Sequence, residues 1–181
     1  MGCFNRLIMA IDVNGIALSS SGGTTLAMDN GATNWMNVNA NGIVTLPQTP
    51  YMAAAFSGQA TYYQGNPITF GAVAANRGSC WNNSTGLWTC PVAGFYLVTM
   101  SGIAAGSAQG VGSYGYIYIN KNGATYAFSH WNLSGSWDGC NLTAIVQCAA
   151  GDTISMSITN ATSSGWYGPG GHCCFGIALV I

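Results

Sequence analysis

Hydrophobic and polar residues alternate along much of the chain, at the period of a β-strand rather than a helix. YGYIYIN (114–120) and TISMSIT (153–159) place similar side chains at every second position. LTAIVQC (142–148) and FGIALVI (175–181) are further runs rich in β-branched and apolar residues. No segment shows the period of an amphipathic helix. The pattern therefore predicts an all-β protein.

The stretch TGLWTCPVAGFYLVTM (85–100) predicts two strands that leave almost no polar face for water. A strand that is apolar on both faces is expected to be covered on both faces. A single β-sandwich covers only one face of each sheet. The second face is therefore predicted to pack against another molecule.

Turn signals divide the chain into short strands and suggest a boundary near Pro47. IDVNGIAL (11–18) resembles MNVNANGIVT (36–45) with a two-residue insertion, and each copy predicts a strand, a turn and a strand. Units this short need neighbours to bury an apolar face. We therefore predict a β-rich arm over 1–46, used for attachment, and a sandwich over 47–181. Asn-Gly pairs that favour tight turns with positive φ stand at 14–15, 30–31, 41–42 and 122–123.

Charge is unusually sparse. Lysine, arginine and acidic residues make up 4% of the 181 residues, against roughly a quarter in an ordinary soluble domain. Such a surface gives weak protection against self-association, so we expect one covered by copies or partners. The formal net charge of −1 provides no electrostatic attraction to nucleic acid or to an anionic membrane. No run approaches the about 20 apolar residues of a spanning helix.

The N-terminus and the cysteines indicate folding in the cell that makes the protein. MGCFNRLIMAID has too short an apolar run for a secretory signal. The seven cysteines match no zinc spacing, which favours buried thiols in a reducing cytoplasm. A bridge between Cys80 and Cys90 remains open because the two flank one predicted hairpin.

The segment 68–102 resembles the signature of the complement C1q-like globular head, which shares its jelly roll with tumour-necrosis-factor ligands. A gap of five residues separates Phe70 from an Asn, and a gap of four separates that Asn from an aromatic residue. A gap of six then leads to a second aromatic residue, and a gap of five to Gly-x-Tyr. The pattern weakens at its end, where Val98 and Met100 replace aromatics. The matching positions are Phe70, Asn76, Trp81, Trp88, Gly94 and Tyr96.

The resemblance covers about 51–181 and implies a ten-stranded jelly roll that forms homotrimers through an apolar axial surface. The six matching residues would serve core and trimer packing. A neighbouring subunit would then cover the second face of the stretch 85–100. Some relatives bind calcium near the trimer axis, and Asp138 on the three-fold is an open alternative here.

A second resemblance concerns the end of the arm. NANGIVTLPQTPYMAAAF (39–56) is similar to the junction in tailed-phage structural proteins that leads into a receptor-like or decorating head. Pro47 and Pro50 would stiffen this bend, since proline fixes φ and removes a donor.

Catalytic chemistry is not indicated. His172 and Cys173 are sequence neighbours, which point to opposite faces of a strand, and nothing orients a pair of His172 with Cys174. His130 is read as an interface residue, and the aspartates are too dispersed for a hydrolytic pair. We expect no enzyme and no cofactor. The remaining candidates for contact with a partner or a glycan are aromatic loop residues: Trp131, Trp137, Trp166 and Tyr167.

Together these features predict a non-enzymatic, homotrimeric structural protein of a phage particle, assembled in the host cytoplasm and displayed on the virion. The favoured role is a capsid decoration or cement protein whose arm binds the major capsid protein or another virion protein. A short tail fibre or receptor-binding tip that recognises host glycan is the alternative. A secreted C1q-like ligand is the second alternative.

Overall fold

The computed structural model describes residues 11–13, 16–21, 25–29, 34–38, 43–46, 48–55, 67–103, 114–132, 139–160 and 174–180. Within these ranges, side chains are described from residue 36 onward, except at 131, 132 and 160. The chain forms two compact units, Met1–Thr49 and Pro50–Ile181. The division lies close to the expected boundary before Pro47.

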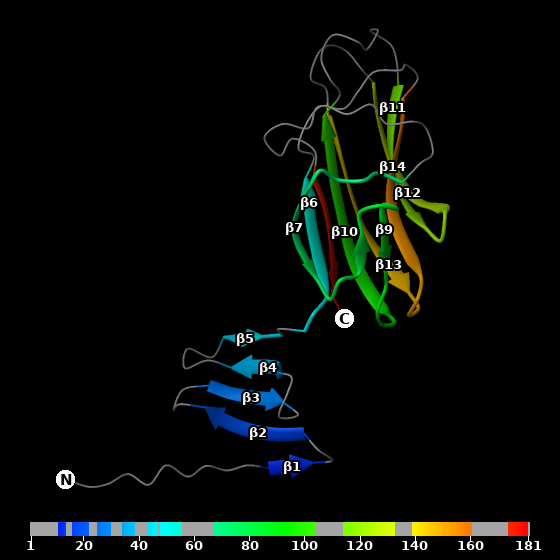
Figure 1. Ribbon diagram of the computed structural model, residues 1–181. Helices are drawn as coiled ribbons and strands as arrows, with labels where there is room; N and C mark the ends of the chain where they lie inside the picture. Colours follow the sequence, from blue (N-terminus) through cyan, green and yellow to red (C-terminus); the bar gives the residue numbers. More distant parts are fainter. Residues whose placement is uncertain are drawn as a thin grey trace, which may run out of the picture. The chain divides into compact units, whose positions relative to one another are not determined.

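The N-terminal unit contains one antiparallel sheet in which each strand pairs with the next along the chain (Figure 1). The two similar segments of the arm form hairpins, with Val13 opposite Ile16 in one and Val38 opposite Val44 in the other. Ile43, Val44 and Leu46 are more than half exposed. The strands are β1 (Ile11–Val13), β2 (Ile16–Ser21), β3 (Thr25–Asp29), β4 (Asn34–Val38) and β5 (Val44–Thr45).

The described residues of the second unit, the head, form ten strands in two antiparallel five-stranded sheets. One sheet, called the β10 sheet, has the order β13-β10-β15-β6-β7, and the other, the β11 sheet, has the order β12-β11-β14-β9-β8. The strands are β6 (Tyr51–Ala55), β7 (Ala72–Arg77), β8 (Trp81–Asn82), β9 (Leu87–Thr89), β10 (Gly94–Ile103), β11 (Tyr114–Lys121), β12 (Ala124–Asn132), β13 (Gly139–Cys148), β14 (Thr153–Asn160) and β15 (Cys174–Leu179). The predicted ten-stranded jelly roll is confirmed.

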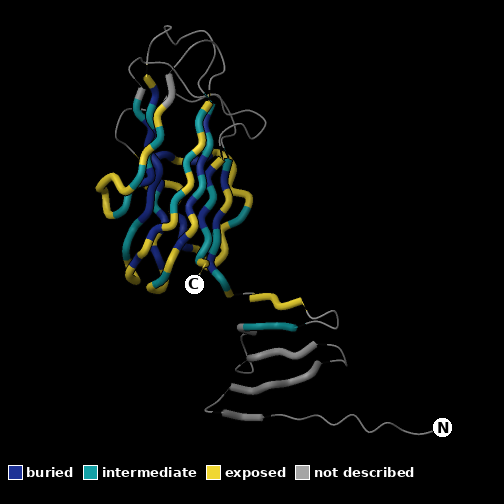
Figure 2. Tube along the Cα trace, turned by 180° about the vertical axis from the view of Figure 1, so that it is seen from behind, coloured by how far each residue is buried: buried dark blue, intermediate teal, exposed yellow. Residues whose placement is uncertain are grey.

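The core lies between the two sheets and follows the alternation in the sequence. Buried and more exposed residues alternate along β10, β11 and β13, as the colours of Figure 2 show. The largest fully buried side chains are Trp88, Tyr96, Phe70, Phe175 and Met52. None of the described residues forms a helix of the length and apolarity that a membrane span requires.

Two turns show why particular residues are needed. Asn122 and Gly123 have φ values of 51° and 79°, and they join β11 to β12 in the tight turn that the Asn-Gly pair predicts. Gly86 has a φ of 68°, and a Cβ atom there would lie 2.6 Å from the carbonyl oxygen of Ile68. Only glycine fits this approach.

Candidate assembly surface

Strand β10 has one buried face and one partly exposed face. Tyr96, Val98 and Met100 point into the core and are at most 3% exposed. Phe95 and Leu97 point the other way and remain 40% and 38% exposed. Strand β10 therefore has one face against the β11 sheet and one apolar face that the head itself leaves open, whereas β9, the other strand of the stretch 85–100, belongs to the β11 sheet.

The open face, called the outer β10 face, continues across neighbouring strands. Leu97 lies opposite Ile145 of β13 on one side and Ala178 of β15 on the other. Ile145 is 59% exposed. Thr99 lies opposite Gly176, which lies opposite Ala53 of β6. The surface thus carries large apolar groups toward β13 and small ones toward β6.

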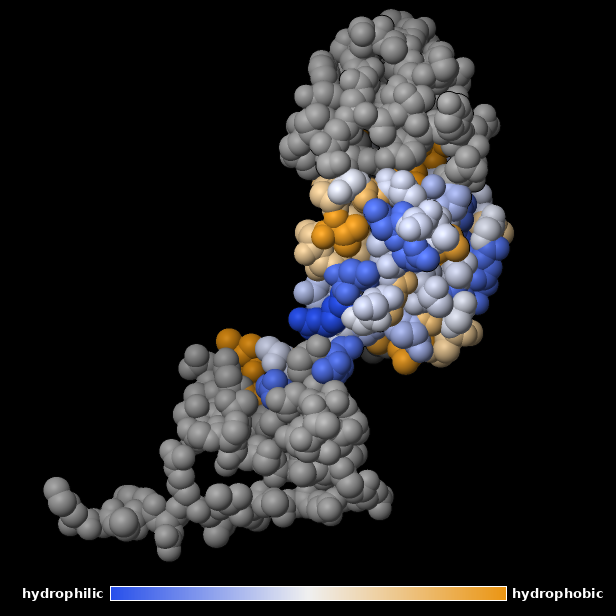
Figure 3. Space-filling model, viewed as in Figure 1, coloured by the Kyte–Doolittle hydropathy of each residue, from blue (hydrophilic) through white to orange (hydrophobic). Residues whose placement is uncertain are grey.

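The outer β10 face is also uncharged. Strands β6, β10, β13 and β15 contain no charged residue. Arg77 of β7 lies at the edge, with its guanidinium 4.7 Å from the centre of the Tyr51 ring. Orange side chains gather over β6 and β7 (Figure 3), where Val73 is 37% exposed. A face of this kind suits burial against another protein surface.

Trp88 of β9 and Tyr96 of β10 pack against each other in the core. Their rings meet edge to face at 6.4 Å. The Tyr96 hydroxyl donates to the carbonyl of Val92 at 2.8 Å, and burial raises the pKa of Tyr96 to about 12. Among the described residues, no acceptor lies at hydrogen-bond distance from the Trp88 indole nitrogen.

Among the other positions of the sequence motif, Phe70 and Trp81 are buried, Gly94 is half-buried and Asn76 is exposed. The rings of Phe70, Trp81 and Phe175 lie 5.6 to 5.7 Å apart in the core. Asn76 accepts from the Trp81 N–H at 3.1 Å and donates to the Trp81 carbonyl at 3.0 Å. Gly94 begins β10. The four aromatic residues of the motif therefore lie in the core. The outward positions Phe95, Leu97 and Ile145 were not singled out from the sequence.

Asn83 is a structural residue that sequence reasoning missed. Its side chain accepts from the Phe70 N–H at 2.9 Å and donates to the Phe70 carbonyl at 2.8 Å. It also accepts from the Trp81 indole N–H at 3.2 Å. One asparagine thus ties the segment before β7 to β8.

Replacing Asn83 with alanine is expected to lower the free energy of unfolding by about 1–3 kcal/mol, because partly buried groups of Phe70 and Trp81 lose their partner. Urea denaturation followed by far-UV circular dichroism measures this loss. Asn82→Ala is the matched control, since the Asn82 side chain accepts only an exposed turn N–H, that of Ser84. Equal losses in the two variants would contradict the assigned role of Asn83.

Most of the aromatic residues expected in contact loops lie outside the described residues. Trp137, Trp166 and Tyr167 lie outside the described residues, as do Asp138, His172 and Cys173. Trp131 lies in β12, but its side chain is outside the description. The described residues show no group of three His, Cys, Asp or Glu side chains placed to hold a metal ion.

An aromatic row on the outer face of the β11 sheet was not anticipated. Tyr116 and Tyr118 stack at 6.1 Å, and Phe128 contacts both rings. The His130 ring lies 5.9 Å from Tyr116, so this histidine packs within the row. Phe128 is 58% exposed. The tyrosines at every second position of YGYIYIN were the signal that could have revealed this row.

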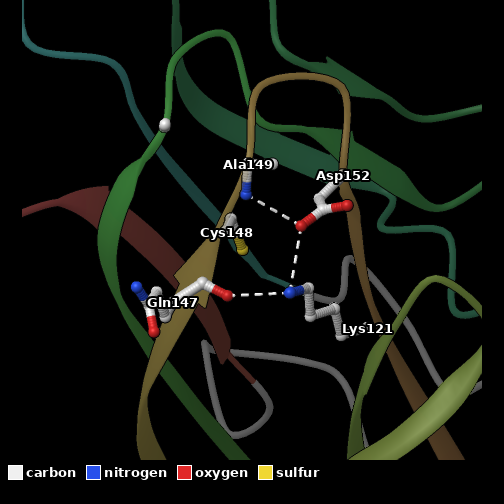
Figure 4. A pocket seen from close by; sticks show the side chains of 6 residues that line it. Lys121, Gln147, Cys148, Ala149 and Asp152 are labelled. Carbon is white, nitrogen blue, oxygen red and sulfur yellow. Dashed lines mark hydrogen bonds and ion pairs between the residues drawn. The ribbon is translucent and has the colours of Figure 1, made fainter.

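Asp152 organises the turn between β13 and β14. Its carboxylate accepts from Asn122 Nδ2 at 2.8 Å and from the Ala149 N–H at 2.9 Å, and it lies 3.0 Å from Lys121 Nζ (Figure 4). These interactions, with the Asn122 bond foremost, lower the pKa of Asp152 to about 2. Lys121 also donates to the Gln147 carbonyl at 2.9 Å.

The contribution of Asp152 to stability is expected to disappear in acid. Because its folded pKa is depressed, this contribution is fully present above the ordinary value of 3.8 and is lost as the pH falls toward about 2. We expect the melting temperatures of the wild type and Asp152→Asn to differ by a constant amount above about pH 5 and to converge near pH 2. Thermal melting from pH 7 to 2 measures this, and a pH-independent difference would contradict it.

The described cysteines are Cys80, Cys90, Cys140, Cys148 and Cys174, and no disulfide joins any two of them. Cys80 donates its S–H to the carbonyl of Gly78 at 3.3 Å. Cys90 is 1% exposed, and burial is the main cause that raises the pKa of its thiol to about 12. The bridge between Cys80 and Cys90 that the sequence left open is absent from this structure.

Comparison with known proteins agrees with the fold. The model of the C1q domain matches residues 51–175. The globular domain of zebrafish complement 1qA protein superimposes with a TM-score of 0.55 at 13% sequence identity, over 73% of this chain and 98% of that one. C1q domains form a family that is generally trimeric and non-enzymatic. Since the match covers more than half of the chain, this protein belongs to the C1q domain family.

Proposed function

We propose that the chain is a non-enzymatic assembly protein whose heads form a homotrimer through the outer β10 face. The observation that carries this proposal is the uncharged apolar surface around Phe95, Leu97 and Ile145. Removing such surface from water contributes roughly 25 cal/mol per Å². C1q domains generally form trimers, which supports the same stoichiometry.

The finer proposal is that this trimer decorates and stabilises the head of a tailed phage. The N-terminal sheet leaves Ile43, Val44 and Leu46 exposed, so it offers apolar surface to a capsid protein or to the arms of the two other copies. Each trimer would bind a repeated lattice through three arms, so the overall binding would be tight even where each single contact is weak. The sparse charge makes such contacts insensitive to salt. The similarity of 39–56 to phage junctions adds support.

Two other roles have their own supporting observations. The aromatic row of Tyr116, Tyr118 and Phe128 favours a short tail fibre or receptor-binding tip, because exposed aromatic rings stack on sugars. The C1q family match itself supports a secreted C1q-like ligand. Both roles use the same trimeric head.

Electron cryomicroscopy of purified particles that contain this chain tests the virion role. We expect trimeric density at three-fold or quasi-three-fold capsid positions, with the N-terminal unit contacting the shell. Density only at the tail periphery would favour the fibre role. Recovery of the chain from the culture medium, free of any particle, would contradict a virion role and favour the secreted ligand.

A further inference from the structure

The strand register of the N-terminal sheet gathers apolar residues on one of its two faces. Ile11 of β1 lies opposite Leu18 of β2, and Leu18 lies opposite Met28 of β3. Met28 in turn lies opposite Met36 of β4. Residues directly opposite each other in an antiparallel ladder share a face of the sheet. Ser20, opposite Leu26, is the single polar residue among the paired positions of this face.

A second apolar row lies on the same face. Leu26 of β3 lies opposite Val38 of β4, and Val38 lies opposite Val44 of β5. Leu26 and Val38 are each two positions from the first row, at Met28 and Met36, so the strand period places both rows on one face. Val44 is 55% exposed, and Met36 and Val38 are half-buried. This surface, called the apolar N-terminal face, is thus open to water where its side chains are described.

The opposite face of the same sheet holds polar and small residues. Ser19 of β2 lies opposite Ala27 of β3. Asp12 and Asp29, the charged residues of strands β1–β5, both lie opposite Ala17 and so share this face. A sheet with one apolar and one polar face is typically packed on the first and hydrated on the second.

The described residues of the N-terminal unit provide no second layer to cover the apolar N-terminal face. They form one five-stranded sheet in which each strand pairs with the next (Figure 1). An apolar sheet face is stable when it is buried against another layer of secondary structure. The missing layer therefore has to come from outside this unit.

We propose that the apolar N-terminal faces of three copies pack against one another as three walls around a common axis. This inference rests on the proposed head trimer. Residues 46–50 join β5 to β6, and a connection of this length spans about 20 Å at most. Three heads in one trimer therefore hold three N-terminal sheets within reach of one another, at an effective concentration on the order of millimolar.

Of the two partners that the proposed function allows for this sheet, the other copies fit the apolar N-terminal face better than a capsid protein does. A closed three-fold arrangement covers each apolar face with the other two and leaves none open. It also keeps Asp12 and Asp29 in water, where an unpaired carboxylate avoids the cost of burial. Any contact of the N-terminal unit with a lattice is then made by the polar face.

Photocross-linking in the full chain tests the arrangement. The photoreactive residue p-benzoylphenylalanine replaces Met28 in one variant and Ala27 in the matched control, since these neighbours in β3 lie on opposite faces. After irradiation, we expect covalent dimers and trimers from the Met28 variant on a denaturing gel. Their cross-linked peptides should map to strands β1–β5 of another copy. The Ala27 variant should remain as single chains.

Light scattering coupled to size-exclusion chromatography separates this inference from the proposed head trimer. A trimeric wild type whose Met28 variant gives no covalent dimers, or gives no more than the Ala27 variant, would overturn the inference and leave the head trimer in place. A wild type that is monomeric at every concentration would overturn both. Glutamate at both Leu97 and Ile145 should abolish the dimers of the Met28 variant, because the sheets are then no longer tethered together.

A second pair of variants covers the case in which the bulky probe disturbs the sheet. Glutamate at both Leu18 and Met28 places two charges on the apolar N-terminal face, and limited proteolysis should then remove the N-terminal unit and release a trimeric head. Glutamate at both Ser19 and Ala27 adds the same charges to the polar face and should leave the unit as resistant as in the wild type. Equal resistance of the two double variants would overturn the inference.

Discussion

Trp88→Ala is expected to destabilise the head by about 3–5 kcal/mol, the usual cost of removing a buried tryptophan. Trp88 is fully buried, its ring packs edge to face on Tyr96, and its backbone pairs with Ile154 and Trp81. A loss of this size is a large fraction of the about 5–15 kcal/mol that stabilises a typical domain. Chemical denaturation followed by far-UV circular dichroism measures it without relying on tryptophan fluorescence.

Two further variants separate burial from aromatic content. Phe128→Ala removes an aromatic ring that is 58% exposed and should change stability by about 0.5 kcal/mol or less in the isolated head. Trp88→Phe should cost less than Trp88→Ala, because it keeps most of the apolar volume and removes an indole N–H that has no acceptor among the described residues. A Trp88→Ala variant as stable as Phe128→Ala would contradict the central position of Trp88.

Local sequence signals predicted the parts of the fold that local chemistry decides. The Asn122–Gly123 pair predicted a tight turn, and both residues have positive φ. The apolar stretch 85–100 predicted two strands, and Tyr96 and Val98 lie on the buried face of β10. The family resemblance implied a core or trimer-packing role for Phe70 and Trp81, and strand period alone would not bring them into contact. They pack within 5.7 Å.

Features that depend on register between distant strands could not be predicted in the same way. The position of Ile145 beside Leu97 follows from the pairing of β10 with β13, which no local pattern specifies. The backbone hydrogen bonds of Cys90 with Gly151 and Asp152 likewise join segments that are far apart in the sequence. The central residues of the outer β10 face therefore became visible only in the structure.

Glutamate at both Leu97 and Ile145 is expected to convert the proposed trimer into a monomer of 18.7 kDa. The two positions lie opposite each other in the β10–β13 ladder, and both are exposed in the isolated head. Two carboxylates in the middle of the outer β10 face would each lose hydration on assembly without a nearby cation, since β6, β10, β13 and β15 carry no charge. Folding itself should persist, because neither side chain points into the core. Light scattering coupled to size-exclusion chromatography measures the mass.

The matched control adds the same two charges elsewhere. Ala124→Glu with Thr125→Glu places them on exposed positions beside the β11–β12 turn, and this variant should remain a trimer with the wild-type melting profile. If charge alone caused dissociation, both double variants would be monomers. A wild type that is monomeric at every concentration, or a Leu97/Ile145 variant that stays trimeric, would contradict assembly through the outer β10 face. A different surface would then have to account for the few charged residues of the chain. The exposed residues Ile43, Val44 and Leu46 of the N-terminal unit would be the next to test.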